Sequence, residues 1–170
     1  MTRRDVTDLS SDAAWDEERR GETETERLDR NWNDLLQELR VVQTGVQLLT
    51  GFLLTLPFQQ RFTQLDTISR DIYIATISSA VVATAALVAP VATHRMLFRR
   101  HARASMVAVG HRFAIVGLGM LAVSVCGVVD VILTLVISDL AGGIGAGSAA
   151  VLFLVAWLVV PLILREKLRT

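Results

Sequence analysis

Residues 113–138 read FAIVGLGMLAVSVCGVVDVILTLVIS, and this stretch decides the fold. It runs for twenty-six residues with a single charged side chain, Asp130. A helix needs about 20 mostly apolar residues to cross roughly 30 Å of hydrocarbon at about 1.5 Å per residue. Because a bilayer core offers no water to peptide groups, an apolar run of this length should be helical. The stretch therefore predicts a membrane-spanning helix.

Three further apolar runs lie on either side of this one, at residues 41–58, 72–93 and 144–164. A soluble bundle of buried helices would need polar faces to meet water, and the last three of the four runs have none. We therefore predict an all-α fold, an integral membrane bundle of four transmembrane helices that occupies residues 41–170 (41–58, 72–93, 113–138 and 144–164).

The distribution of Arg and Lys predicts the orientation of these helices. Fifteen of them lie in the tail, the second connection and the C-terminal end, whereas the other two connections hold two. The positive-inside rule therefore predicts that both termini are cytoplasmic, in a bacterial inner or plasma membrane. In the second connection, Arg95, Arg99, Arg100 and Arg103 are candidates for contact with anionic lipid head groups.

The segment before the first run divides into two parts. Residues 1–22 are charged and poor in apolar residues, which predicts a disordered acidic cytoplasmic tail. From Thr23 onward, a capping box with Glu26 predicts the start of an amphipathic cytoplasmic helix over residues 23–40. Apolar residues then recur in steps of four and three into the first run, at Leu28, Trp32, Leu35, Leu39, Val42, Val46, Leu49 and Leu53. This heptad seam predicts one long helix whose first half lies on the membrane surface or packs on a partner.

Asp130 is the most informative single residue. It stands about five residues past the centre of its run, on the order of 7 Å toward the exterior. A carboxylate at membrane depth costs roughly 2.5–3.5 kcal/mol and usually faces a bundle interior or a cavity. Two interpretations stay open: a proton- or cation-binding site, or an Asp that is neutral or paired and fixes helix packing.

Two amides, Gln43 and Gln47, lie along one side of the first run. Amides in lipid need hydrogen-bond partners, so they either pair helices or line a polar path, where they would join Asp130 in a candidate ion or proton site. Small residues are candidates for close helix packing: Gly119 and Ala122 share the face of Asp130, and Gly143 and Gly147 have GxxxG spacing. Residues 117–122 fit a dinucleotide-binding fingerprint by letter, but these glycines lie within a spanning helix, which predicts packing.

Several short stretches resemble a family of small four-helix bacterial membrane proteins classed as a domain of unknown function. They are ELRVVQTGVQ at 38–47, GFLLTLPF at 51–58, Arg61-Phe62, Leu65-Asp66, Arg70, Tyr73, Pro90 and His94-Arg95. The resemblance covers roughly residues 24–168. It implies the four-helix topology. Some relatives carry the label sodium:proton antiporter, but the family brings no functional residues.

Two functional hypotheses follow. One is a membrane component that assembles with itself, as a homo-oligomer, or with a membrane partner through residues 24–40. The alternative is a small oligomeric transporter or channel for protons or cations that uses Asp130; four helices alone rarely enclose a pathway. No His–acid, Ser–His or metal-ligand constellation appears, so we expect neither an enzyme nor a catalytic residue. We also expect no cofactor, metal or nucleic acid as a partner.

Overall fold

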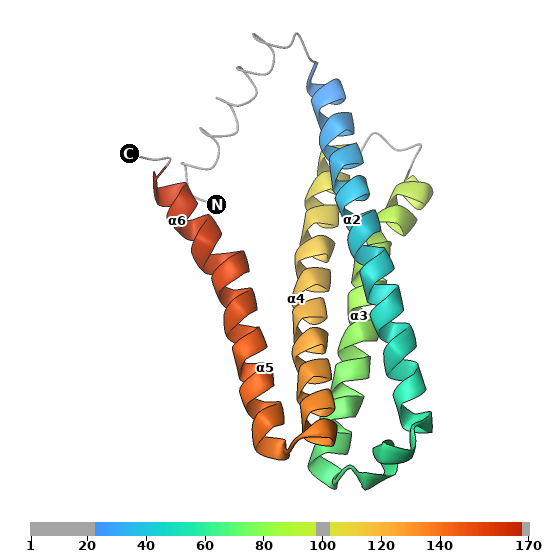
Figure 1. Ribbon diagram of the computed structural model, residues 1–170. Helices are drawn as coiled ribbons and strands as arrows, with labels where there is room; N and C mark the ends of the chain where they lie inside the picture. Colours follow the sequence, from blue (N-terminus) through green and yellow to red (C-terminus); the bar gives the residue numbers. More distant parts are fainter. Residues whose placement is uncertain (1–22, 98–102, 168–170) are drawn as a thin grey trace.

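The computed structural model describes residues 23–97 and 103–167, and every regular element in these ranges is helical. The elements are α2 (Glu24–Thr55), the short 3₁₀ turns η1 (Leu56–Phe58) and η2 (Gln60–Gln64), α3 (Thr67–Leu97), α4 (Arg103–Val136), α5 (Asp139–Leu154), the π-helical turn η3 (Val155–Val159) and α6 (Val160–Lys167). The prediction of an all-α fold is confirmed. Figure 1 shows α2, α3 and α4 side by side, with α5 joined to the end of α4.

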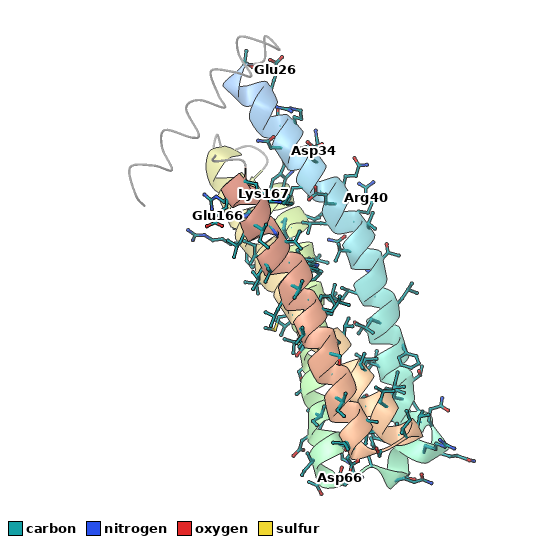
Figure 2. The ribbon with its side chains drawn as sticks, turned by 60° about the vertical axis from the view of Figure 1, so that its left-hand side comes forward. Glu26, Asp34, Arg40, Asp66, Glu166 and Lys167 are labelled. Carbon is teal, nitrogen blue, oxygen red and sulfur yellow. The ribbon has the colours of Figure 1, made fainter. Side chains whose placement is uncertain are left out.

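Four helices in the described residues are long and apolar enough to cross a membrane. Their candidate spans are Asp29–Phe58, Thr67–Thr93, Val109–Val136 and Asp139–Lys167. Each contains 27 to 30 residues, so each exceeds the roughly 20 residues that a bilayer requires. In Figure 2, Glu26, Asp34, Glu166 and Lys167 lie at one end of the molecule and Asp66 lies at the other.

Helix α2 begins with the predicted capping box and buries the predicted seam. The hydroxyl of Thr23 accepts the Glu26 N–H at 3.3 Å, and the Glu26 carboxylate accepts the Thr23 N–H at 2.8 Å. The most buried seam residues recur every seven positions: Trp32, Leu39, Val46 and Leu53 are 8, 3, 0 and 0% exposed. One continuous helix therefore carries the seam from the polar segment into the candidate span.

Two side-chain hydrogen bonds tie α3 to α2. The Tyr73 hydroxyl donates to the Leu53 carbonyl at 2.9 Å. In a regular helix that carbonyl would accept from residue 57, but Pro57 has no N–H to donate. The Leu53 carbonyl instead accepts the Leu56 N–H of the tighter last turn, and the Tyr73 hydroxyl supplies its second hydrogen bond where α2 ends. Nearer the other end of the bundle, the Gln43 amide donates to the Leu87 carbonyl at 2.7 Å.

Helices α3 and α4 approach each other closely at two glycines of α4. A methyl group at Gly117 would collide with Leu87, and one at Gly127 would collide with the buried side chain of Thr76. Next to Gly127, the buried Ser124 hydroxyl donates to the Thr76 carbonyl at 3.2 Å. The packed core of the molecule is therefore a three-helix unit of α2, α3 and α4.

The fourth span packs differently from the other three. Within the described residues, α5 contacts α4 but neither α2 nor α3, and α6 approaches none of these helices. Figure 1 shows this span diverging from α4 toward α6. Between α5 and α6, the Val160 N–H donates to the Val155 carbonyl, five residues back. This π-helical turn precedes Pro161, whose ring crowds the preceding turn of a regular α-helix.

Candidate functional site at the α4–α5 hairpin

Asp130 lies where α4 meets the first turns of α5. A methyl group at Gly142 of α5 would collide with the Thr134 hydroxyl and would lie 2.8 Å from the Asp130 carbonyl and 3.3 Å from its carboxyl Oδ1. Gly142 is the one buried residue of α5. The absence of a side chain there lets the backbone of α5 approach Asp130 and Thr134 on α4.

The hairpin that creates this contact is short and capped by hydrogen bonds. At the end of α4, the N–H groups of Ile137 and Ser138 both donate to the Leu133 carbonyl, at 2.8 and 3.2 Å. Ser138 then caps α5 by accepting the Ala141 N–H at 3.3 Å, and Asp139 occupies the first helical turn. A carboxylate at a helix N-terminus is favourable. The hairpin thus holds a second acid near Asp130.

The polar side-chain groups at this contact, on Asp130 and Thr134, form no hydrogen bonds with other described residues. Elsewhere in the bundle the Thr50, Thr76 and Thr84 hydroxyls donate to the carbonyl four residues earlier. Within the described residues, no hydrogen bond engages the Thr134 hydroxyl or the Asp130 carboxyl. Asp130 is half-buried. The contact therefore contains a carboxyl and a hydroxyl group whose hydrogen-bonding capacity no other described residue uses.

The structure does not bring the two amides to Asp130. Gln43 is engaged with the α3 backbone at Leu87, and Gln47 is exposed on α2. Asp130 instead faces α5, which does not contact α2 in the described residues. One protomer thus forms no site shared by Asp130, Gln43 and Gln47, and Gln43 serves to pair helices.

The small residues that pack against other helices differ from those we expected. A methyl group at Gly119, Gly143 or Gly147 would meet no atom within 4 Å, so these glycines contact no other helix of the protomer. Ala122 is half-buried. The close contacts lie at five other glycines, Gly110, Gly117, Gly127, Gly142 and Gly145. On α5, Gly142 and Gly145 are about one helical turn apart and both face α4. The predicted GxxxG pair, Gly143 and Gly147, lies on the opposite face.

The segment over residues 24–40 packs on its own chain. Trp32 is buried, and its ring lies against Gly110 of α4. Leu39 is buried in a cluster with Leu87 of α3 and Ala114 of α4. The other face is polar: Asn31, Asn33, Asp34, Gln37, Glu38 and Arg40 are exposed. A partner of this segment would have to bind the polar face.

The predicted contact with lipid head groups falls mostly outside the described residues. Arg99 and Arg100 lie in the gap at 98–102, and only the backbone of Arg95 and Arg103 is described. The predicted acidic tail at 1–22 also lies outside the described residues. Both predictions therefore stay predictions.

Comparison with known proteins identifies one family. The sequence matches DUF6328, a family of unknown function, over residues 21–161. No curated protein and no solved structure matches significantly. The match confirms the resemblance to a four-helix family of unknown function, whereas the antiporter label and the bacterial origin stay expectations.

Proposed function

Because this chain belongs to DUF6328, whose function is unknown, the family assigns no activity, and we propose that the protein is a non-enzymatic membrane component that assembles with itself through its fourth span. The proposed orientation puts both termini in the cytoplasm. It is supported by the excess of Arg and Lys on that side, fifteen against two.

The observation that carries the proposal is the open face of the fourth span, on the side away from its contact with α4. No residue from 143 to 167 is buried, whereas each of α2, α3 and α4 buries residues along its length. Gly143 and Gly147 lie on the same face, and a methyl group at either would meet no atom within 4 Å. About two to three turns beyond Gly147, Phe153 and Trp157 form an edge-to-face pair with ring centres 4.8 Å apart.

Lipid alone could cover an apolar helix face. Small residues on that face, however, favour contact with another helix. Association of spanning helices is driven by van der Waals packing, which is best where glycines let two backbones approach. A second copy would present the same face, since closed dimers use one patch twice. A symmetric contact centred on Gly147 would bring the Gly143–Gly147 faces of the two copies together.

Cysteine cross-linking in vesicles tests this contact. In a Cys126→Ala background, which removes the single natural cysteine, Gly147→Cys should give a disulfide-linked dimer on mild oxidation. The matched control is Gly51→Cys, because Gly51 on α2 is equally open. A dimer at position 147 and none at position 51 is the expected result. Monomer at both positions, or equal dimer at both, would contradict the proposal.

A second candidate function is transport of protons or cations at Asp130. It is favoured by the carboxyl of Asp130 and the hydroxyl of Thr134, which make no hydrogen bond within the described residues. One protomer brings no further polar residue of α2 to Asp130, so a pathway would need a second copy. Proton and sodium flux in proteoliposomes, compared between wild type and Asp130→Asn, decides the matter. Flux lost in the variant supports transport, and no flux in either protein removes this candidate.

A further inference from the structure

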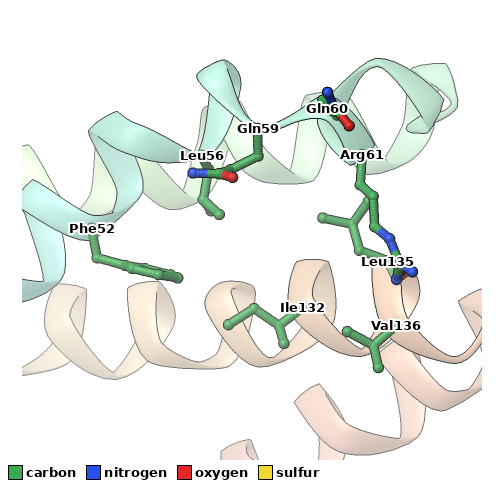
Figure 3. Close-up of a pocket in the computed structure, with 8 residues that line it drawn as sticks. All are labelled: Phe52, Leu56, Gln59, Gln60, Arg61, Ile132, Leu135 and Val136. Carbon is green, nitrogen blue, oxygen red and sulfur yellow. Dashed lines mark hydrogen bonds between the residues drawn. The ribbon is translucent and has the colours of Figure 1, made fainter.

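A groove of about 470 Å³ opens between the end of α2 and the end of α4 (Figure 3). Ligand sites in proteins commonly enclose roughly 300–1,000 Å³. The two helices and the turn η1 supply apolar walls, formed by Phe52, Leu56, Ile132, Leu135 and Val136. The connection after α2 adds a polar margin, formed by Gln59, Gln60 and Arg61. The groove is therefore amphipathic, with a single charged residue in its lining.

Arg61 reaches across the mouth of this groove. Figure 3 shows its side chain extending from the connection toward Leu135 on α4. Its Nη1 donates to the Leu135 carbonyl at 3.5 Å, a long contact that uses one of five N–H groups. Within the described residues, no carboxylate pairs with Arg61. The guanidinium of Arg61 therefore has further N–H groups that can bind an anion in the groove.

The polar and apolar parts of the groove follow one another along the helix axes. Phe52 on α2 lies four residues before Leu56 of η1, about 6 Å further from the connection along the helix axis. The candidate span containing both residues ends at Phe58, and Arg61 follows it. The cationic margin therefore lies at the level where lipid head groups begin, and the apolar walls extend toward the hydrocarbon.

We propose that this groove holds one phospholipid with an anionic head group. The phosphate would bind Arg61, and an acyl chain would lie along Phe52 and Ile132. A guanidinium fork binds phosphate oxygens in pairs, which a neutral side chain cannot do. A zwitterionic lipid would bring its own cation close to Arg61, so the groove favours phosphatidylglycerol over phosphatidylcholine. This site is separate from the Gly143–Gly147 face of the fourth span.

Native mass spectrometry of the purified full chain tests the proposal, with phosphatidylglycerol and phosphatidylcholine of matched acyl chains as probes. Wild type should retain one phosphatidylglycerol in preference to phosphatidylcholine. Arg61→Gln should weaken phosphatidylglycerol binding roughly tenfold, the loss expected for a charge-assisted hydrogen bond. Arg70→Gln is the matched control, because Arg70 is exposed near the start of α3 and does not line the groove.

A second pair of variants tests the apolar wall without touching the charge. Phe52 is 46% exposed and Leu48, one turn earlier on α2, is 73% exposed, so the bundle should tolerate alanine at either position. Phe52→Ala should lower phosphatidylglycerol binding, and Leu48→Ala should leave it unchanged. Equal binding of the two lipids to wild type would overturn the proposal. So would an equal effect of Arg61→Gln and Arg70→Gln, or of Phe52→Ala and Leu48→Ala.

Discussion

Gly127 is one of two glycines of α4 at which α3 leaves no room for a side chain. Thr76 opposite it is buried, β-branched and fixed by a hydrogen bond from its hydroxyl to the Ile72 carbonyl at 2.7 Å. Gly127→Ala should therefore destabilise the protein by about 1–3 kcal/mol, the usual cost of overpacking. Thermal unfolding in detergent measures this. Gly119→Ala on the same helix meets no atom and should be neutral or stabilising, since alanine favours helix over glycine. Equal midpoints for the two variants would show that the contact is loose.

Asp66 caps the start of α3 and makes its stability depend on pH. Its carboxylate accepts the Ser69 N–H at 2.9 Å. Hydrogen bonds from the side chain and backbone of Ser69 hold the pKa of Asp66 below its usual range. A lowered pKa means that the ionised carboxylate stabilises the folded state above the unfolded pKa of about 3.9. This contribution is lost as the pH falls through the lower, folded pKa.

Asp66→Asn keeps a capping oxygen but does not titrate. Its unfolding midpoint should therefore vary less than that of wild type between pH 5 and 3, about the range in which Asp titrates. The two proteins should differ most at neutral pH and converge in acid. Parallel midpoint curves for the two proteins across this range would mean that the cap does not contribute.

At the scale of the element, the early part of α2 depends on packing against α4. Trp32 is buried against Gly110, so Trp32→Ala should release residues 29–40 while the apolar spans stay folded. Hydrogen exchange should then quicken in this segment and remain slow around the buried Val46. Asn33→Ala, on the exposed face, is the control and should leave exchange unchanged. Unchanged exchange in Trp32→Ala would show that the helix is held by other contacts.

The seam of α2 could be predicted because an apolar residue recurring at heptad spacing in a polar segment has one physical cause, burial on a helix. Glycines inside an apolar helix do not stand out from their neighbours in this way, so their spacing does not show which of them are buried. Gly142 and Gly145 face α4 while Gly143 and Gly147 face away, and both pairs have helical spacing. Composition also could not predict that Asp130 meets Gly142 rather than Gln47, because hydropathy gives the length of each span but not the side it turns to its neighbours.

At the scale of the whole molecule, α2, α3 and α4 pack on one another, whereas the fourth span packs on α4 alone, through α5. The four spans were predictable from length and hydropathy, because a bilayer imposes both. The divergence of α6 from α4 could not be predicted, since the fourth span is as apolar as the three that pack on one another. The open Gly143–Gly147 face of an apolar helix is the feature on which the proposed self-assembly rests.

Subunit counting by single-molecule photobleaching in dilute vesicles tests the proposed self-assembly most directly. The wild-type protein should bleach in two or more steps. Gly147→Leu should bleach in one step, because the leucine side chain would keep the Gly143–Gly147 faces of two copies apart. Gly51→Leu, at an open position on α2, should behave as wild type. One-step bleaching of the wild-type protein would contradict the account.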